Sequence, residues 1–157
     1  MRNSCSSTSA ILLFCRTQVP HGALRLHVMG ERGAARESHM DGVPTGMPAV
    51  QRASKVQNRA AKVGFDWSEA SQVIPKVREE LDELEEVLDD RDLAESELGD
   101  VLFSVINLAR HLGLDGEVAL RKAIDRFETR FRLMEGAGPV EGVSLEELNQ
   151  RWEQAKT

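Results

Sequence analysis

Four acidic residues form two pairs with the same internal spacing. Glu80 and Glu83 make the pattern E-x-x-E, and after thirteen intervening residues Glu97 and Asp100 make the pattern E-x-x-D. Side chains three residues apart lie on one side of a helix, so two adjacent antiparallel helices can bring both pairs to one point. Four oxygen donors, with few His or Cys residues nearby, suit Mg²⁺ or Mn²⁺ better than Zn²⁺. The spacing therefore predicts a divalent metal site.

The first pair lies in an acidic stretch, EELDELEE, which begins at Glu79 and holds six carboxylates. On an isolated helix, such a stretch is most often a solvated face. We expect this for the three acids that point away from the apolar stripe of the helix, which are Asp82, Glu85 and Glu86. Glu80 and Glu83 flank the stripe, and position alone leaves both interpretations open for them.

The second pair lies in ELGDVLFSVINLARHL, a segment that is apolar around most of a helical circumference. We therefore predict that this helix is buried and central. Buried carboxylates are rare unless they are paired or bound to a cation, because desolvating an uncompensated charge costs several kcal/mol. Glu97 and Asp100 thus favour a cation at this place over a merely solvated acidic face.

The elements that must position these acids are helical. From Pro48 onward the pattern has a helical period and no convincing alternation of period two. Helices are expected over residues 48–64, 69–90, 93–112, 115–134 and 144–156. Gly64 and Gly113 suit left-handed C-terminal caps, and Ser144 with Glu147 forms a capping box. We predict an all-α fold, an antiparallel helical bundle of four to five helices that is completed by dimerisation.

Dimerisation is expected because apolar residues occupy more than one side of the third helix. Val101, Phe103 and Ile106 are spread around it, which is more apolar surface than the helices of one chain can cover. The simplest assembly is a homodimer, with a higher homo-oligomer as the alternative.

The chain changes in composition near Pro48. Residues 1–47 are rich in Ser, Gly and Arg and show no sustained period, so we predict a disordered N-terminal extension, while residues 48–157 form the folded domain. A start at Met40 or a targeting peptide are alternative explanations of the extension. Both cysteines, Cys5 and Cys15, lie in this extension, so neither can form a disulfide within the domain.

The overall charge and hydropathy exclude two classes of partner. The net charge of −6 argues against a surface that binds nucleic acid, which requires clustered Lys and Arg. The apolar run AILLF is far too short to span a membrane. We therefore expect a cytoplasmic protein that binds neither nucleic acid nor membrane.

Four segments of the chain resemble one known family. KVQNRAAKVGFDW, KVREELDELEE, ELGDVLFSVINLARHLG and RFETRFRLME are similar to the MazG family of nucleoside triphosphate pyrophosphohydrolases. These are all-α enzymes of the wider group that includes dimeric dUTPases and phosphoribosyl-ATP pyrophosphohydrolase. The resemblance runs from Pro48 to Lys156 and is to the C-terminal catalytic half of the two-domain members. It implies Mg²⁺-dependent hydrolysis of nucleoside triphosphates to the monophosphate and pyrophosphate, in nucleotide-pool house-cleaning.

The resemblance also implies a role for each matching residue. Glu80, Glu83, Glu97 and Asp100 would be the Mg²⁺ ligands, with Mn²⁺ as the alternative ion. Glu79 or Glu80 would activate the attacking water. The substrate-binding residues would be Lys76, Arg126, Arg130, Trp152 and Lys156.

The fourth helix departs from the family pattern. Where the family often carries Lys-Phe-Glu-Arg-Arg, this chain has RFETR, so Arg126 replaces the lysine and Thr129 replaces an arginine. Arg126 and Arg130 stand four apart on one face, and no acid lies three or four residues from either. Polyphosphate oxygens are therefore a better partner for them than a salt bridge within the helix. Ser96 stands where the family has an acid, and Glu95 is the nearest substitute.

Several further residues allow two interpretations. Trp152 is either a core residue or a contact to the nucleobase. His111, near the end of a helix, suits the helix dipole better than a role as catalytic base. Phe65, Asp66 and Trp67 are expected to shape the wall of the site.

Two other functions stay open from the sequence. A related enzyme could act on dUTP or phosphoribosyl-ATP, which a panel of nucleotides would distinguish. A non-catalytic helical dimerisation module predicts no metal-dependent change in thermal stability, and the acids Glu97 and Asp100 in an apolar helix argue against it.

Overall fold

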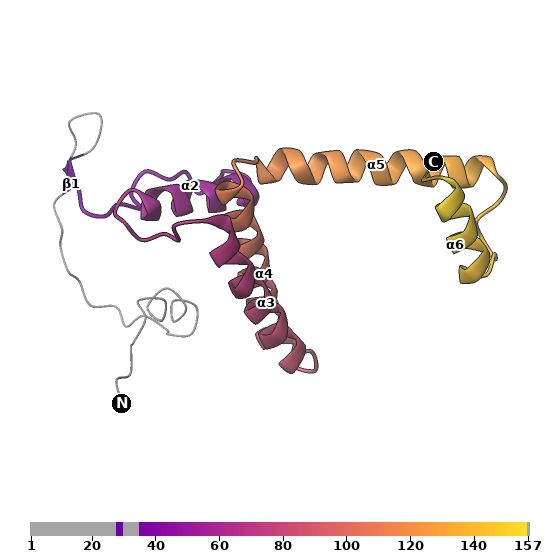
Figure 1. Cartoon of the computed structure of the whole chain (residues 1–157), viewed down its shortest axis with the longest axis horizontal. Helices are drawn as coiled ribbons and strands as arrows, with labels where there is room; N and C mark the ends of the chain where they lie inside the picture. Colours follow the sequence, from indigo (N-terminus) through magenta and orange to yellow (C-terminus); the bar gives the residue numbers. More distant parts are fainter. Residues whose placement is uncertain (1–27, 30–34, 157) are drawn as a thin grey trace. The chain divides into compact units, whose positions relative to one another are not determined.

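The computed structural model describes residues 28–29 and 35–156 (Figure 1). The described part confirms the predicted all-α fold, with helices α2 (Ala49–Ala61), α3 (Ala70–Glu86), α4 (Arg91–His111), α5 (Gly116–Gly136) and α6 (Leu145–Gln154). Ahead of them, β1 (Val28–Met29) and β2 (Ala35–Arg36) form a short antiparallel pair, in which Val28 lies opposite Arg36. None of the described helices is long and apolar enough to cross a membrane.

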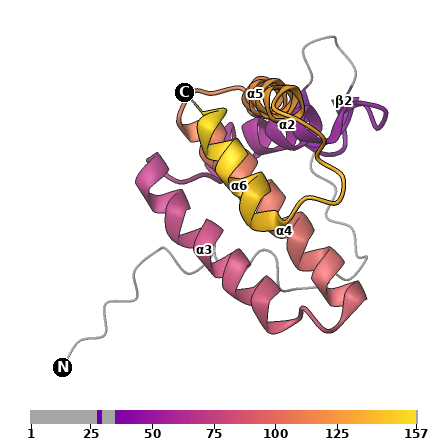
Figure 2. The same ribbon diagram turned by 90° about the vertical axis from the view of Figure 1, so that its right-hand side faces the viewer.

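The chain divides into two compact units, the first ending at Gly116 and the second running from Glu117 to Thr157. In the first unit α3 and α4 lie side by side, joined by a short turn, and α2 also packs on α4 (Figures 1 and 2). The second unit contains most of α5 and all of α6. The acid pairs therefore lie in the first unit, and the predicted phosphate-binding arginines lie in the second.

Glycines end two helices of the first unit as the sequence predicts. Gly64 has φ 84°, its N–H donates to the carbonyl of Ala61, and the N–H of Phe65 donates to the carbonyl of Ala60. Gly113 has φ 68° and closes α4 with the same pair of bonds. A residue with a Cβ is strained at such positive φ, so glycine fixes where each helix stops.

The turn between α3 and α4 begins earlier than expected. The expected helix over residues 69–90 ends at Glu86, and the next begins at Arg91 instead of Leu93. Asp90 sets the start of α4, because its carboxylate accepts hydrogen bonds from the N–H groups of Asp92 and Leu93, at 3.1 and 3.2 Å, and so caps this helix.

Within one chain, α4 buries a mainly polar side. Ser104 and Asn107 are buried there beside Val101, while the apolar residues Leu98 and Leu102 are exposed. The expectation that α4 is buried around most of its circumference is therefore not met by a single chain. Its buried side lies toward α2 and α3, which are the helices that pack on α4. Gln57, for example, donates from Nε2 to the carbonyl of Phe103 at 2.8 Å.

In the second unit α6 starts at the predicted cap. The hydroxyl of Ser144 accepts the N–H of Glu147 at 3.3 Å. The carboxylate of Glu147 pairs with Arg151 at 2.6 Å, and Arg151 also donates to the carbonyls of Gly138 and Pro139. Arg151 therefore ties α6 to the loop that follows α5. On α5, Met134 is buried, whereas the apolar residues Leu120, Ile124, Phe127 and Phe131 are exposed.

The segment before α2 is partly described. Arg59 on α2 donates from Nη1 to the carbonyls of His39 and Asp41, and the carboxylate of Asp41 accepts the N–H of Ser38 at 2.8 Å. Most of the expected N-terminal extension, residues 1–47, lies outside the described residues. The division into an extension and a domain at Pro48 stays a prediction.

Candidate functional site

Three of the four predicted metal ligands converge between α3 and α4. Glu80 and Glu83 from α3 and Glu97 from α4 each offer a carboxylate oxygen, and these oxygens lie within 4.8 Å of one another. Asp100, one turn further along α4, has no oxygen in this group. The half-buried Asp100 therefore remains a predicted fourth ligand.

The carboxylate of Glu80 is the most constrained member of the group. It is 0% exposed, and its Oε1 lies 2.7 Å from the Nζ atom of Lys76. Neither oxygen has a hydrogen bond of good geometry among the described residues, and Oε2 has no charged partner there either. A buried carboxylate oxygen without a partner is costly, and a hard divalent cation is the kind of partner that oxygen ligands select. The donor set therefore fits Mg²⁺ or Mn²⁺.

Lys76, predicted to contact substrate phosphate, lies against the acids instead of in solvent. Its side chain is only 6% exposed and pairs with Glu79 at 3.1 Å as well as with Glu80. Burial by itself lowers the pKa of Lys76, but its close contacts with the negative charges of Glu80 and Glu79 outweigh burial and raise this pKa above its ordinary value. The ammonium is therefore charged, and it neutralises part of the acidic group.

The remaining acids of the stretch behave as the sequence predicts. Asp82, Glu85 and Glu86 are exposed on the outer side of α3. Glu79 is intermediate, with its side chain 39% exposed, so it lies next to the buried acids and still reaches solvent. The acidic stretch therefore has two faces, one solvated and one directed at α4.

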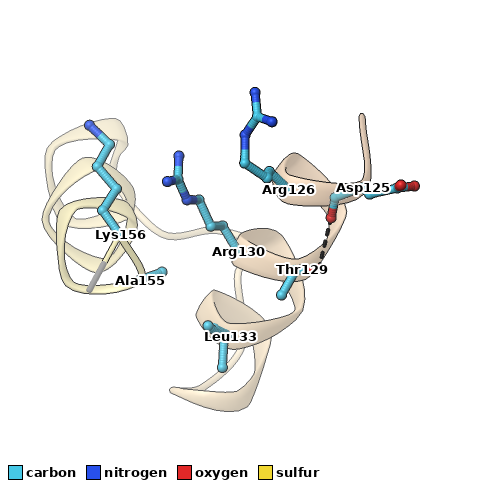
Figure 3. Close-up of a pocket in the computed structure, with 7 residues that line it drawn as sticks. All are labelled: Asp125, Arg126, Thr129, Arg130, Leu133, Ala155 and Lys156. Atoms are coloured by element: carbon cyan, nitrogen blue, oxygen red, sulfur yellow. Dashed lines mark hydrogen bonds between the residues drawn. The ribbon is translucent and has the colours of Figure 1, made fainter. Parts of the chain in front are cut away.

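The second unit brings together three of the predicted substrate-binding cations. Arg126, Arg130 and Lys156 line a cavity of about 380 Å³ between α5 and the end of α6, and in Figure 3 their side chains extend toward the same side. The other lining residues are Asp125, Thr129, Leu133 and Ala155. Neither arginine forms an ion pair within the described part of the chain, whereas Lys156 pairs with Glu153 at 2.5 Å. The cavity thus offers unpaired guanidinium groups to an anion.

Trp152 packs beside this cavity. Its ring lies 5.1 Å from that of Phe127, and the guanidinium carbon of Arg130 lies 5.9 Å from the Trp152 ring centroid. Such a cation–π contact orients the arginine. Trp152 is half-buried, so part of its ring is a packing surface and part stays accessible.

Thr129, the departure from the family pattern, does not aim its hydroxyl at the cavity. Its Oγ1 donates to the carbonyl of Asp125 at 2.8 Å, as the dashed line in Figure 3 shows. The family arginine at this position is thus replaced by a side chain bound to its own helix. We expect Arg126 and Arg130 to supply the positive charge that α5 offers an anion.

A polar network that sequence reasoning missed joins the link after α2 to the end of α4. The carboxylate of Asp66 accepts from Nη1 and Nη2 of Arg110 at 2.9 and 2.5 Å, and the Nε2 atom of His111 lies 2.8 Å from its Oδ1. Asn107 accepts from Arg110 as well, at 2.6 and 3.0 Å. The ring of Trp67 meets His111 edge-on, with centroids 6.5 Å apart.

This network fixes the position of the link that carries Phe65 and Trp67. Burial alone raises the pKa of Asp66, but the hydrogen bonds and charges of Arg110 and His111 outweigh it and hold this pKa below its ordinary value. Asp66 and Arg110 are 44 residues apart, so no local pattern in the sequence links them. The only signal was the spacing of Asn107 and Arg110, three apart on one helix face.

Fold and site together define a class of protein. Two adjacent helices of an all-α fold bring together acidic residues that suit a hard cation. A second helical unit has arginines that can bind an anion. Residues 68–132 match the family model of the MazG nucleotide pyrophosphohydrolase domain. This stretch of the chain is therefore similar to the MazG domain.

Known relatives agree with this assignment. Over 131 residues the chain is 44% identical to the nucleoside triphosphate pyrophosphohydrolase of Escherichia coli (strain K12). The aligned region covers 78% of this chain and 50% of that protein. It is 43% identical, again over 131 residues, to the nucleoside triphosphate pyrophosphohydrolase/pyrophosphatase MazG of Thermotoga maritima, covering 80% of this chain and 51% of that protein. The uncharacterized protein YabN of Bacillus subtilis is 38% identical over 135 residues, or 80% of this chain and 27% of that protein. The chain spans about half the length of the first two relatives.

Proposed function

We propose that this chain hydrolyses nucleoside triphosphates to the nucleoside monophosphate and pyrophosphate, with Mg²⁺ as its cofactor and Mn²⁺ as the alternative ion. The observation that carries the proposal is the convergence of Glu80, Glu83 and Glu97 in a domain that matches the MazG family. The names of the E. coli and T. maritima relatives support the same reaction.

In this proposal Glu80, Glu83 and Glu97 hold the cation, and Asp100 is the fourth ligand. When bound, the ion would neutralise polyphosphate charge and would make water a stronger nucleophile. Glu79 is the better placed general base, because it borders the group and is partly exposed, whereas Glu80 is fully buried. Glu80 is the alternative base.

The reaction balances with one water. The water oxygen forms a bond to the α-phosphorus, and the bond from this phosphorus to the α–β bridging oxygen breaks. The bonding electron pair leaves with the pyrophosphate, and the proton of the water passes to Glu79. Lys76, Arg126, Arg130 and Lys156 bind the phosphates and stabilise the departing charge. Trp152 offers the accessible part of its ring to the base.

The test is product analysis with a panel of nucleotides and Mg²⁺. The panel should hold the common ribo- and deoxyribonucleoside triphosphates, aberrant nucleotides with oxidised or deaminated bases, dUTP and phosphoribosyl-ATP. Release of pyrophosphate, and not of orthophosphate, supports the proposal. A preference for aberrant nucleotides supports a house-cleaning role, whereas turnover of dUTP or phosphoribosyl-ATP alone selects the related enzymes. If the protein turns over no nucleotide and metal does not raise its thermal stability, the result favours the non-catalytic helical dimerisation module.

We expect Arg130→Gln to raise the KM for nucleoside triphosphate by roughly tenfold or more, because a charge-assisted hydrogen bond to phosphate is worth about 1.5–3 kcal/mol. Arg126→Gln should act in the same direction. Arg132→Gln is the matched control, since Arg132 lies on the same helix, is exposed and pairs with Glu128. Steady-state kinetics of the three variants test the assignment, and equal KM values for Arg130→Gln and Arg132→Gln would contradict it.

We also propose that the chain forms a homodimer, with a higher homo-oligomer as the alternative. The exposed residues Leu98, Leu102 and Val105 follow one another at spacings of four and three along α4, so they share one apolar face. A face of this kind is typical of a surface that another copy covers.

Leu102→Glu should convert the dimer to a monomer, because burying a carboxylate in the interface costs more than the leucine contributes. Leu145→Glu is the control, since Leu145 is also exposed but lies at the start of α6. Sedimentation velocity at micromolar concentration is the measurement. A wild-type protein that sediments as an active monomer contradicts the proposal.

A further inference from the structure

Lys76 is buried in an ion pair, whereas a lysine that binds phosphate directly needs an accessible ammonium group. Lysine side chains are almost never buried unless they are paired, and the side chain of Lys76 is 6% exposed with both Glu79 and Glu80 as partners. A phosphate cannot reach an ammonium group enclosed in this way. If Lys76 contacts substrate, its side chain must first leave Glu80.

The carboxylate that Lys76 occupies is also the buried member of the metal site. An oxygen of Glu80 lies within 4.8 Å of oxygens of Glu83 and Glu97, so Glu80 belongs both to the ion pair and to the acidic group. An ammonium on one oxygen and a divalent cation on the other would be close neighbours at a carboxylate that is itself 0% exposed. Repulsion between like charges is little screened there, so the two cations compete for Glu80.

Glu79 can remain the ion-pair partner of the Lys76 ammonium after this ammonium leaves Glu80. It lies 3.1 Å from Lys76 Nζ, has no oxygen in the acidic group, and is 39% exposed. The stem of lysine is flexible and carries its charge toward water readily. Lys76 can therefore release Glu80, keep Glu79 and turn outward without a change in the backbone of α3.

We propose that Lys76 is the resident counter-ion of Glu80 in the metal-free protein, that it leaves Glu80 when a divalent cation is bound, and that it becomes available to substrate phosphate only then. This inference rests on the proposed function, because it takes Glu80, Glu83 and Glu97 to be the metal site. It makes Lys76 a residue that couples loading of the site to phosphate binding, and it predicts that metal and ammonium exclude each other at Glu80.

The first test follows the accessibility of Lys76 in the wild-type full-length chain. Reductive methylation with ¹³C-formaldehyde, followed by peptide mapping, should modify Lys76 slowly without metal and at least tenfold faster with saturating Mg²⁺. The exposed Lys55 and Lys62 should react at the same rate in both conditions and serve as internal controls. Continued protection of Lys76 in the Mg²⁺-saturated protein would overturn the inference.

The second test removes the competing charge. Lys76→Met should bind Mn²⁺ at least tenfold more tightly than the wild type, as measured by electron paramagnetic resonance, and should melt at a lower temperature without metal because Glu80 loses its counter-ion. Arg78→Met is the matched control, since it removes one positive charge from an exposed position of the same helix. It should change the Mn²⁺ affinity less than twofold.

The outcomes separate the inference from the function on which it rests. If the wild type binds Mn²⁺ and Lys76→Met binds it no more tightly, the inference fails and the metal site stands. If neither protein binds Mn²⁺, the metal site fails and the inference fails with it. If Lys76→Met does not fold without metal, the methylation experiment on the wild type still decides the question. It shows whether the metal displaces Lys76 from Glu80 or whether both cations bind this carboxylate together.

Discussion

Replacing Glu83 with glutamine will lower Mg²⁺-dependent turnover by on the order of a thousandfold while the helical content stays that of the wild type. The activity falls because a neutral amide replaces one of the converged oxygen ligands, and metal coordination supplies several kcal/mol of transition-state stabilisation. The fold survives because removing one of several close negative charges relieves repulsion in the metal-free protein. Steady-state kinetics and circular dichroism measure the two effects.

The acidic stretch supplies its own controls for this result. Glu85→Gln and Glu86→Gln remove the same charge from exposed positions of α3 and should leave turnover within about twofold, as expected for surface sites. Asp100→Asn decides the status of the fourth acid, because Asp100 lies outside the converged group. Loss of turnover makes it a ligand, and wild-type turnover removes it from the site. Wild-type activity in Glu83→Gln would refute the site as a whole.

The largest loss of stability is expected from Asp66→Asn. Asp66 accepts hydrogen bonds from Arg110 and lies 2.8 Å from His111, whose side chains are 13% and 9% exposed. Removing one partner of a buried ion pair leaves the other charge uncompensated, which costs about 3–5 kcal/mol when burial is complete. Here the pair is partly exposed, so we expect about 2–3 kcal/mol, measured by urea denaturation. Asp82→Asn, at an exposed position of α3, should change the free energy of unfolding by less than about 0.5 kcal/mol.

The same residue gives a prediction for the dependence of stability on pH. The pKa of Asp66 is lower in the folded protein than the ordinary value of 3.8, so its contribution is complete above the pKa of the unfolded chain. The contribution is lost as pH falls through the folded pKa, because the unfolded chain then binds the proton first. Asp66→Asn should therefore lose less stability than the wild type below about pH 4. Parallel loss in both proteins would show that folding does not lower the pKa of Asp66, and would contradict the prediction.

Local features of this fold could be predicted from the sequence because neighbours in the chain cause them. The glycine caps at Gly64 and Gly113 follow from backbone strain at one residue, and the cap at Ser144 follows from a side chain that reaches three residues ahead. The convergence of Glu80 and Glu83 with Glu97 needed only helical periodicity and the assumption that consecutive helices pair. That assumption is sound when the turn between them is short.

The tertiary structure decided which surfaces face inward. Periodicity shows that α4 is apolar on several sides, but it does not show which side is buried. Ser104 and Asn107 are buried while Leu98 and Leu102 stay exposed, because burial depends on which helices pack against α4. The spacing of Lys76 and Glu80 permits an ion pair, yet only packing buries it and makes the ammonium a competitor for the metal site. Asp66 and Arg110 meet across 44 residues of chain. Sequence determined what lies within one helical turn, where geometry is fixed by bonds, and packing determined the contacts between elements that no local rule connects.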